Sequence, residues 1–233
     1  MSQSSTHCDC SGTPSECRNH SELETLRAKV AELEDQIAEL TALVRTDGLT
    51  GLYNHRYFRE ALHRELERTQ RTGVDFCLML LDLDHFKNVN DTYGHEIGNL
   101  ALQHTATLIK ESLRPMDLPC RYGGEEFAIL LPSTPLLTSR QVAERIRTTI
   151  ENTPINTGEH TLQLTASLGI AAYNKNSILT GEQLIETADQ QLYRAKQTGR
   201  NRVCYAAIAT SEKQNVSQEE KDLLFDVFNS SPK

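Results

Sequence analysis

The sequence predicts an α/β (α+β) fold, in which helices flank a mixed central β-sheet and an N-terminal coiled-coil helix precedes the domain. Helical and strand-like segments alternate along most of the chain, which is typical of a sheet covered by helices. A glycine pair, Gly123 and Gly124, separates two apolar strands and predicts a hairpin, so the strands cannot all be parallel. An unbroken heptad repeat near the N-terminus predicts the coiled coil.

The composition fits a folded protein that does not bind its partners through bulk charge. The 233 residues are 38% hydrophobic and 24% charged, with a formal net charge of −8 at pH 7. This charge argues against binding of a nucleic acid polymer or an anionic membrane surface. No apolar run approaches the roughly 20 residues that span a bilayer, and Met1-Ser2-Gln3 resembles no signal peptide or myristoylation site. We therefore expect a cytoplasmic protein without a membrane span.

Residues 1–20 are rich in Ser, Thr, Cys and His and have no apolar period, which predicts a flexible segment. Thiolates and imidazoles suit Zn²⁺, and this segment contains five of them, at His7, Cys8, Cys10, Cys17 and His20. Their spacing fits no standard zinc finger. A zinc or redox-sensing site is thus the alternative to incidental cysteines in a flexible tail. A second flexible tail is predicted over residues 209–233.

Residues 21–46 carry the heptad repeat. Ser21 and Glu24 fit a capping box at the start of a helix. Apolar side chains then alternate at spacings of three and four, at Leu23, Leu26, Val30, Leu33, Ile37, Leu40 and Val44. Leucine at every d position and mostly β-branched residues at a favour a parallel two-stranded coiled coil. The alternative is an amphipathic helix packed on its own domain. We expect a homodimer through this stalk, on which a regulatory protein or ligand could act.

Residues 47–208 contain the alternating elements of the predicted domain. Asp47–Gly51 interrupts the first helix, and a helical pattern resumes from Phe58 to Leu66. Phe76–Leu81 is wholly apolar, as in a buried central strand. The later elements are a helix, a hairpin, a helix, a strand, a helix and a strand, over residues 98–113, 120–131, 138–152, 161–173, 181–197 and 202–208.

Four carboxylates are expected at one edge of this sheet. Asp82 and Asp84 follow the buried strand, and Glu125 and Glu126 follow the hairpin turn. Asp82 and Glu125 could then share one cation, which would offset their mutual repulsion. Mg²⁺ suits this position because it takes oxygen ligands and leaves positions open for substrate phosphates. The alternative is that these strand-end carboxylates only face solvent.

Four blocks of sequence resemble, in this order, the GGDEF family of bacterial diguanylate cyclases. They are Asp47-x-Leu49-Thr50-Gly51-Leu52-x-Asn54, Asp82-Leu83-Asp84-x-Phe86-Lys87-x-x-Asn90-Asp91-x-x-Gly94-His95, Arg121-Tyr122-Gly123-Gly124-Glu125-Glu126-Phe127 and Leu192-Tyr193-x-Ala195-Lys196-x-x-Gly199-Arg200-Asn201-Arg202. The third block is the signature in its GGEEF form. His55 stands where the family usually has Arg. The resemblance covers the whole predicted domain and implies a nucleotidyl-cyclase, palm-like fold.

The resemblance implies that two GTP molecules condense to cyclic di-GMP, with release of two pyrophosphates, in the presence of Mg²⁺ or Mn²⁺. Asp82 and Glu125 match the side-chain metal ligands, with the carbonyl of Leu83 beside them. Glu126 is the second acid of the signature, and which glutamate serves proton transfer from the attacking 3′-hydroxyl stays open. The positions that match nucleotide contacts are Lys87, Asn90, Asn99, Gly123, Gly124, Lys196 and Arg200. Each domain would hold one GTP, so two domains must face each other.

Asn99 departs from the family, which usually has Asp at this position. A carboxylate can accept hydrogen bonds from both N1–H and the N2 amino group of guanine, whereas Asn offers one accepting oxygen. We expect weaker GTP affinity or a relaxed base preference, without loss of the chemistry.

Arg114-Pro115-Met116-Asp117 resembles the RxxD inhibitory site of the family. The resemblance implies that Arg114 and Asp117 bind cyclic di-GMP and so inhibit the enzyme. The alternative is an ordinary surface salt bridge of little energetic value.

The leading hypothesis is therefore an Mg²⁺-dependent diguanylate cyclase that acts as a dimer. The alternatives are a non-catalytic domain that senses GTP or cyclic di-GMP, and a coiled-coil scaffold with a vestigial domain. The retained acids favour catalysis, and Asn99 is the feature that favours the sensor.

Overall fold

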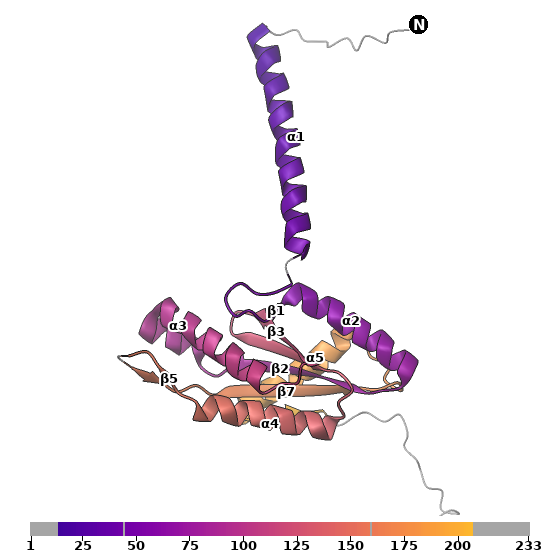
Figure 1. Cartoon of the computed structure of the whole chain (residues 1–233), viewed down its shortest axis with the longest axis vertical. Helices are drawn as coiled ribbons and strands as arrows, with labels where there is room; N and C mark the ends of the chain where they lie inside the picture. Colours follow the sequence, from indigo (N-terminus) through magenta and orange to yellow (C-terminus); the bar gives the residue numbers. More distant parts are fainter. Residues whose placement is uncertain (1–13, 44, 159, 207–233) are drawn as a thin grey trace, which may run out of the picture. The chain divides into compact units, whose positions relative to one another are not determined.

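The computed structural model describes residues 14–43, 45–158 and 160–206, which divide into two units (Figure 1). The first unit is helix α1 (Pro14–Leu43), and the second is a domain that starts at Thr46. Each unit is considered by itself. No helix among the described residues is both long enough and apolar enough to cross a membrane.

Helix α1 begins earlier than predicted, at Pro14 and not at Ser21. Proline is favoured in the first helical turn because the amide it lacks has no partner there, so residues 14–20 belong to the helix and do not precede it. Five apolar side chains of the heptad are more than half exposed, namely Leu23, Leu26, Val30, Leu33 and Leu40. The side chains of the predicted zinc cluster (His7, Cys8, Cys10, Cys17 and His20), and those of Ile37 and Val44, lie outside the described residues, as does the tail 209–233.

The domain contains a six-stranded mixed sheet, as the sequence predicts. The strands are β1 (Tyr53–Asn54), β2 (Phe76–Leu83), β3 (Leu118–Gly123), β4 (Glu126–Leu131), β7 (Ala166–Tyr173) and β8 (Val203–Tyr205). Their order is β1-β3-β4-β2-β7-β8, and the pairs β1/β3 and β7/β8 are parallel while the three central pairs are antiparallel. Strands β5 (Ile155–Asn156) and β6 (Thr161–Leu162) form a separate small hairpin.

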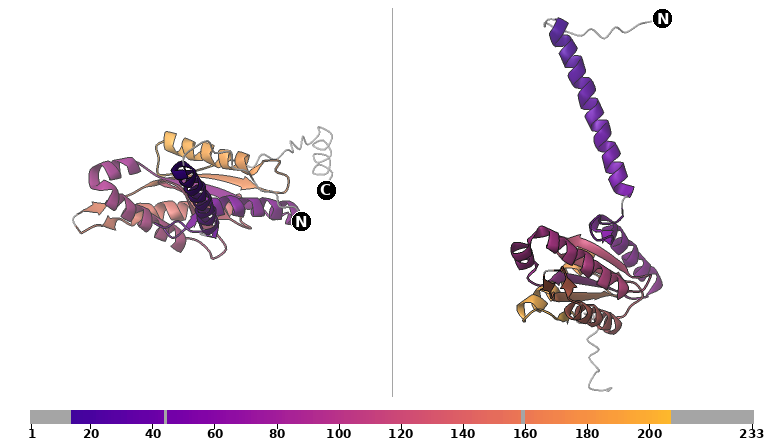
Figure 2. Two further views of the ribbon diagram at one scale, coloured as in Figure 1. Left: turned by 90° about the horizontal axis from the view of Figure 1, so that it is seen from above. Right: turned by 60° about the vertical axis from the view of Figure 1, so that its left-hand side comes forward.

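Four helices cover the two faces of the sheet (Figures 1 and 2). All eight residues of β2 are buried, and their side chains alternate between the faces. Cys77, Met79, Leu81 and Leu83 pack with α3 (Phe86–Glu111) and α4 (Leu136–Asn152). Phe76, Leu78 and Leu80 pack with α2 (His55–Thr72) and α5 (Gly181–Gln197) on the other face. A strand with two apolar faces is therefore the centre of both hydrophobic layers.

Some element boundaries differ from the predicted ones. Helix α3 starts at Phe86 and not at Gly98, and it bends at Gly94, which has φ 82° and ψ 164°. The segment before the bend has mostly exposed side chains, so it has no apolar periodicity that would predict a helix. The strand predicted over residues 161–173 is two strands, β6 and β7, because residues 163–165 leave the ladder.

The hairpin turn also differs from the prediction. Gly123 pairs with Glu126, so Gly124 and Glu125 form the turn. Neither Gly123 nor Gly124 has a positive φ, so the hairpin does not use the left-handed backbone that a tight Gly-Gly turn usually adopts. The pairing of β3 with β4 shifts by one residue between Arg121 and Gly123, and this β-bulge bends the hairpin next to the turn.

Helix α5 crosses β7 at very short range over Gly169. A Cβ atom at this position would lie 2.2 Å from the carbonyl oxygen of Ala188 and 2.2 Å from the amide nitrogen of Leu192. Both atoms belong to the backbone of α5, which cannot yield as a side chain can. The absence of a side chain at Gly169 therefore sets how closely α5 approaches the sheet.

Candidate active site

Asp82 and Glu126 lie opposite each other at one end of the two central strands. The antiparallel register of β2 and β4 pairs these two residues, and paired residues project to the same face of a sheet. This is the face covered by α2 and α5, since Leu80 precedes Asp82 in the same alternation. Asp82 is only 6% exposed. The structure thus brings a strand-end acid and a hairpin acid together.

Glu125 is held beside the end of β2 by the backbone. The amide of Leu83 donates a hydrogen bond to the carbonyl oxygen of Glu125, with an N···O distance of 3.4 Å. The turn residue and the strand end are therefore neighbours, although they are 42 positions apart in the sequence (125 − 83 = 42). Asp82, Leu83 and Glu125, the three residues predicted to surround a metal, are adjacent.

Two cations from the end of α5 face these acids. The Lys196 ammonium forms an ion pair with Asp82, with Nζ 2.8 Å from Oδ2, and its side chain is about one third exposed (32%). The positive charge of Arg200, just beyond the helix, favours ionised Asp82 and so opposes part of the rise that burial causes in its pKa. The two basic residues that the sequence places on one helix end thus both act on β2, called the metal strand below because it ends in the predicted metal ligands Asp82 and Leu83.

The acids at this edge hold their protons more tightly than isolated acids do. Burial raises the pKa of Asp82, and the Lys196 ammonium offsets this only in part. Burial also raises the pKa values of Glu125 and Glu126, and the negative charge of Asp82 raises both further. Three carboxyl groups that repel one another in this way would be stabilised by an additional cation.

The donor set at this edge fits Mg²⁺ or Mn²⁺. Both metals prefer oxygen ligands, and Mg²⁺ is usually held by one or two carboxylates together with substrate phosphates. Asp82 and Glu125 supply the carboxylates, and the backbone carbonyl of Leu83 is adjacent. Among the residues that the structure describes, no three His, Cys, Asp or Glu side chains form a ready-made metal cluster.

Asp84, which the sequence places near the same edge, has other partners. Its carboxylate accepts hydrogen bonds from the hydroxyls of Thr165 (2.8 Å) and Ser167 (2.7 Å) and from the amide of Asn201 (3.0 Å). It is 6% exposed. Its oxygens are thus occupied within the protein, unlike those of Glu125 and Glu126.

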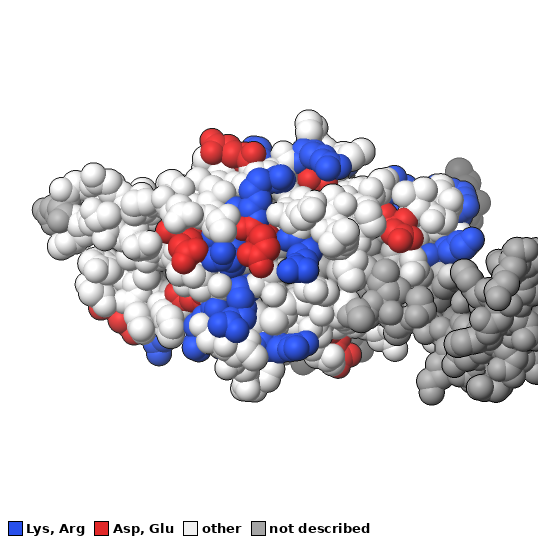
Figure 3. Space-filling view, turned by 90° about the horizontal axis from the view of Figure 1, so that it is seen from below, with Lys and Arg blue, Asp and Glu red and all other residues white. Residues whose placement is uncertain are grey.

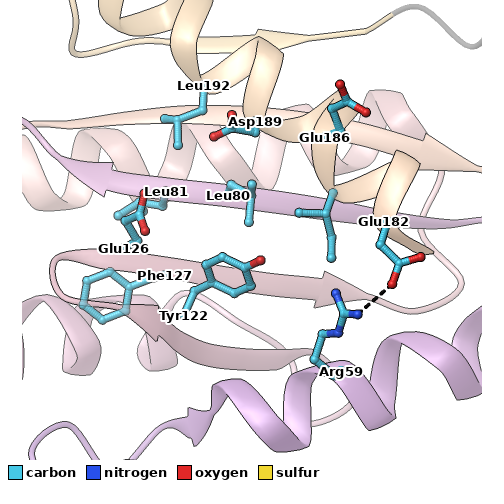
Figure 4. A pocket seen from close by; sticks show the side chains of 11 residues that line it. Arg59, Leu80, Leu81, Tyr122, Glu126, Phe127, Glu182, Glu186, Asp189 and Leu192 are labelled. Atoms are coloured by element: carbon cyan, nitrogen blue, oxygen red, sulfur yellow. Dashed lines mark hydrogen bonds and ion pairs between the residues drawn. The ribbon is translucent and has the colours of Figure 1, made fainter. Parts of the chain in front are cut away.

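Glu126 also lines a cleft of about 330 Å³ between the sheet, α2 and α5 (Figure 4). The floor of the cleft is apolar, with Leu80 and Leu192, and Tyr122 lies at its centre. Arg59 closes one end by an ion pair with Glu182 of 2.7 Å. Burial and the negative charge of Asp82 raise the pKa of Glu126, and the positive charge of Lys196 opposes this rise. The negative charge of Asp189, on α5, adds a smaller increase.

Three predicted nucleotide contacts lie along α3, on both sides of its bend: Lys87 for the triphosphate, and Asn90 and Asn99 for the base. Lys87 is exposed in the first turn, directly after the metal strand, and Asn99 is exposed after the bend. Asn90 is half-buried and lies against Gly98, where a Cβ would be only 2.0 Å from Oδ1 of Asn90. The absence of a side chain at Gly98 therefore leaves the space that Asn90 occupies. Asn99 directly follows this glycine in the sequence.

Arg121 links the hairpin turn to the start of the domain. Its guanidinium donates two hydrogen bonds to the carbonyl oxygen of Gly124, at 3.1 and 2.9 Å, and pairs with Asp47 at 3.3 Å. Asp47 in turn accepts hydrogen bonds from the amide and hydroxyl of Thr50. This role of Arg121 was not predicted from the sequence, although its place in the signature was a signal.

Arg114 and Asp117 form a tight turn on the domain surface. The amide of Arg114 donates to Asp117 Oδ2 at 2.9 Å, and the amide of Asp117 donates to the Arg114 carbonyl at 3.0 Å. Burial raises the pKa of Asp117, and the charges of Arg114 and Arg145 oppose this. Arg145 of α4 lines a cavity of about 580 Å³ together with Arg114. No sequence pattern connects Arg145 with this turn, so the sequence analysis missed it.

Comparison with known proteins identifies the family. The model of the family described as "Diguanylate cyclase, GGDEF domain" matches residues 44–202. The chain belongs to the GGDEF family. The matched range contains every strand of the six-stranded sheet except β8, the helices α2 to α5 and the loop after α5. It therefore contains every described site residue of the GGDEF domain.

Relatives of this GGDEF protein include named cyclases. It is 43% identical to diguanylate cyclase DgcP of Pseudomonas aeruginosa over 173 residues, which are 74% of this chain but 25% of DgcP. It is 39% identical to the response regulator PleD of Caulobacter vibrioides over 173 residues, which are 73% of this chain and 38% of PleD. The chain thus spans less than half the length of either relative.

Two of the solved structures that match this chain contain diguanylate cyclase or GGDEF domains with a partner molecule bound. The coiled coil and GGDEF domain of DgcB from Caulobacter crescentus, in complex with c-di-GMP, matches with a TM-score of 0.67 and 31% identity, over 80% of this chain and 98% of that one. The diguanylate cyclase SiaD of Pseudomonas aeruginosa, in complex with its activator SiaC, matches with a TM-score of 0.67 and 38% identity, over 82% of this chain and 75% of that one.

Proposed function

We propose that this GGDEF protein is a diguanylate cyclase that joins two GTP molecules into cyclic di-GMP and releases two pyrophosphates. The observation that carries the proposal is the grouping of Asp82, Glu125 and Glu126 with Lys196 at one end of the central sheet. Acids for a metal and cations for phosphates are the two requirements of phosphoryl transfer. The named cyclases among the relatives support this choice of reaction.

In this proposal Asp82, Glu125 and the carbonyl of Leu83 hold Mg²⁺ or Mn²⁺, which, when bound, stabilises negative charge on the phosphates. Lys196 and Arg200 bind the triphosphate through charge-assisted hydrogen bonds, together with Lys87. A Cβ at Gly124 would meet no atom within 4 Å, so a nucleotide can come close to the hairpin turn at Gly124.

Asn90 and Asn99 bind the guanine base, and Glu126 lies near the hydroxyl that reacts. The 3′-oxygen of one GTP attacks the α-phosphorus of the other, its proton is lost, and pyrophosphate leaves. Glu126 has the raised pKa of a group that can take up this proton. The same step then occurs with the two nucleotides in exchanged roles.

Because each domain holds one GTP, the reaction needs two domains that face each other. We propose that two copies of α1 pair through the exposed heptad side chains as a parallel coiled coil. Such a tether raises the effective concentration of one domain near the other. DgcB, whose structure includes a coiled coil, and SiaD, whose structure contains an activator, support a stalk on which a regulatory protein or ligand acts.

The proposal is tested by incubating the purified chain with GTP and MgCl₂ and measuring cyclic di-GMP by mass spectrometry. We expect cyclic di-GMP and pyrophosphate in a ratio of about 1:2, and no product once EDTA has removed the divalent metal. If the chain binds GTP and Mg²⁺ but forms no cyclic di-GMP, the cyclase proposal is wrong.

A nucleotide sensor is the second candidate, and Asn99 is the observation that favours it. A sensor would bind GTP or cyclic di-GMP without turnover, through the same base-binding residues or through Arg114 and Asp117. The experiment above distinguishes the two functions, because only the cyclase consumes GTP.

The exchange Asn99→Asp is expected to lower the KM for GTP by about three- to tenfold and to increase discrimination against ATP. A carboxylate accepts charge-assisted hydrogen bonds from two guanine donors, whereas the amide accepts with one oxygen. Steady-state kinetics with both nucleotides measures the change. Asn176→Asp, which adds the same charge in an exposed loop, is the control. An unchanged KM and unchanged discrimination would contradict the assignment of Asn99.

The exchange Arg114→Ala is expected to raise the cyclic di-GMP concentration needed for half-maximal inhibition by about tenfold or more. The guanidinium provides charge-assisted bonds to phosphate and a flat surface for guanine, beside the buried Asp117. Inhibition is measured relative to the initial rate of each variant at increasing product concentrations. Arg71→Ala, at an exposed position in the last turn of α2, is the control. Equal inhibition of Arg114→Ala and the unmodified chain would exclude this site.

A further inference from the structure

The loop after α5 is held in an unusual backbone conformation. Gly199, Arg200 and Asn201 all have positive φ, at 117°, 60° and 45°. For residues other than glycine, the left-handed region is energetically unfavourable. Two such residues in succession persist only where the surroundings hold them. Arg200, one of the three cations proposed to bind the triphosphate, is one of these two residues.

The buried carboxylate of Asp84 holds one side of this loop. It accepts the amide hydrogen of Asn201 at 3.0 Å, while Thr165 and Ser167 fix its other positions. The amide of Asp84 donates to the carbonyl of Thr165 at 2.9 Å. The loop is therefore fixed to the end of β2, two residues from Asp82.

Helix α4 holds the other side through the Asn201 side chain. Arg147 donates to Oδ1 of Asn201 at 2.8 Å, and Nδ2 of Asn201 donates to Glu151 at 2.7 Å. Arg147 is itself paired with Glu144 at 2.9 Å and Glu151 at 2.7 Å, and its side chain is 14% exposed. Both polar atoms of the Asn201 side-chain amide therefore form hydrogen bonds with α4. Figure 3 shows acidic and basic side chains interleaved on the face of the domain seen from below.

These contacts lie between the surface of α4 and the metal strand. Lys196 and Arg200 are the cations that act on Asp82, and Arg200 directly precedes Asn201. The amide of Arg200 donates to the carbonyl of Ala195 at 3.0 Å, so the loop turns back on the last turn of α5. A substitution at Asn201 would therefore allow the Arg200 side chain to change its direction, while α5 stays in place.

We propose that Asn201 is a positioning residue, which holds the loop between Asp84 and the Arg147–Glu151 pair and so directs Arg200 toward the nucleotide phosphates. Asparagine suits this position because it tolerates the left-handed region better than most residues and its amide both donates and accepts. The inference rests on the proposed function, since Arg200 is the phosphate contact that Asn201 serves.

The test is a double-mutant cycle read out by binding and not by turnover. The probe is 3′-deoxy-GTP with MgCl₂, which has no 3′-hydroxyl and cannot cyclise, measured by isothermal titration calorimetry. Asn201→Gly keeps the left-handed conformation but removes the side chain. We expect the Kd to rise about fivefold to tenfold, as for loss of one oriented charge-assisted contact, and to change less than twofold for the control Asn176→Gly.

The decisive arm uses the Arg200→Ala background. If Asn201 acts through Arg200, Asn201→Gly then changes the Kd by less than twofold. A merely structural role would weaken binding equally in both backgrounds, and that result would overturn the inference. An unchanged Kd for Asn201→Gly alone, or no binding of the probe by the unmodified chain, would overturn it as well. Binding of the probe without formation of cyclic di-GMP from GTP would reject the proposed function and still test Asn201.

Discussion

The exchange Glu125→Ala is expected to reduce the rate of cyclic di-GMP formation by about 10³-fold or more. Glu125 is one of the two carboxylates available for the metal, and its neighbour Asp82 is already paired with Lys196 at 2.8 Å. Without Glu125, one carboxylate and a backbone carbonyl remain for a divalent ion. The initial rate with GTP at saturating MgCl₂ measures the loss.

Two further measurements make this result specific. Titration with MgCl₂ separates weakened metal binding from lost proton transfer, because extra metal restores part of the rate only in the first case. The control is Glu60→Ala, which removes an exposed glutamate of α2 that pairs with Arg56. If Glu125→Ala retained more than a tenth of the rate, the metal site would have to lie elsewhere.

The exchange Gly169→Ala is expected to lower the free energy of unfolding by about 2–3 kcal/mol. The new Cβ would lie 2.2 Å from two backbone atoms of α5 and 2.8 Å from the Cα of Leu192. These contacts are far shorter than any that real Cβ atoms make, so the helix must move away from β7. Urea denaturation followed by circular dichroism measures the difference.

The displacement of α5 should also reach the active site, because Lys196 lies in the last turn of this helix. We expect the Kd for 3′-deoxy-GTP to rise along with the loss of stability. Gly48→Ala is the matched control, since a Cβ at Gly48 meets no atom within 4 Å and its φ is not positive. Equal stability of the two alanine variants would show that α5 adapts without cost.

The central features of the fold could be predicted because local patterns determine them. An uninterrupted apolar run identified β2, and a clear amphipathic pattern identified α5, whose observed bounds are the predicted 181–197. Boundaries that depend on backbone geometry could not be predicted. The bend at Gly94 and the short strand β1 have no apolar period of their own.

The site residues likewise divide into those that a sequence pattern indicates and those that only the packing of the fold brings together. Sequence order placed Asp82, Glu125 and Lys196 in recognisable blocks, and the register of β2 and β4 explains why the acids meet. The partners of Asp84 could not be foreseen, because Thr165, Ser167 and Asn201 come from two other segments. Arg145 and Arg147 were missed because α4 resembles an ordinary charged surface helix until its neighbours are known.

The ion pair between Asp82 and Lys196 has a consequence for what can enter the site. Separating the pair leaves a negative and a positive group, each partly shielded from water and each in need of a new companion. A free divalent ion satisfies only the carboxylate, and a bare triphosphate satisfies only the ammonium. A nucleotide that arrives already chelated satisfies both at once, so we expect the complex to enter the site more readily than either component alone.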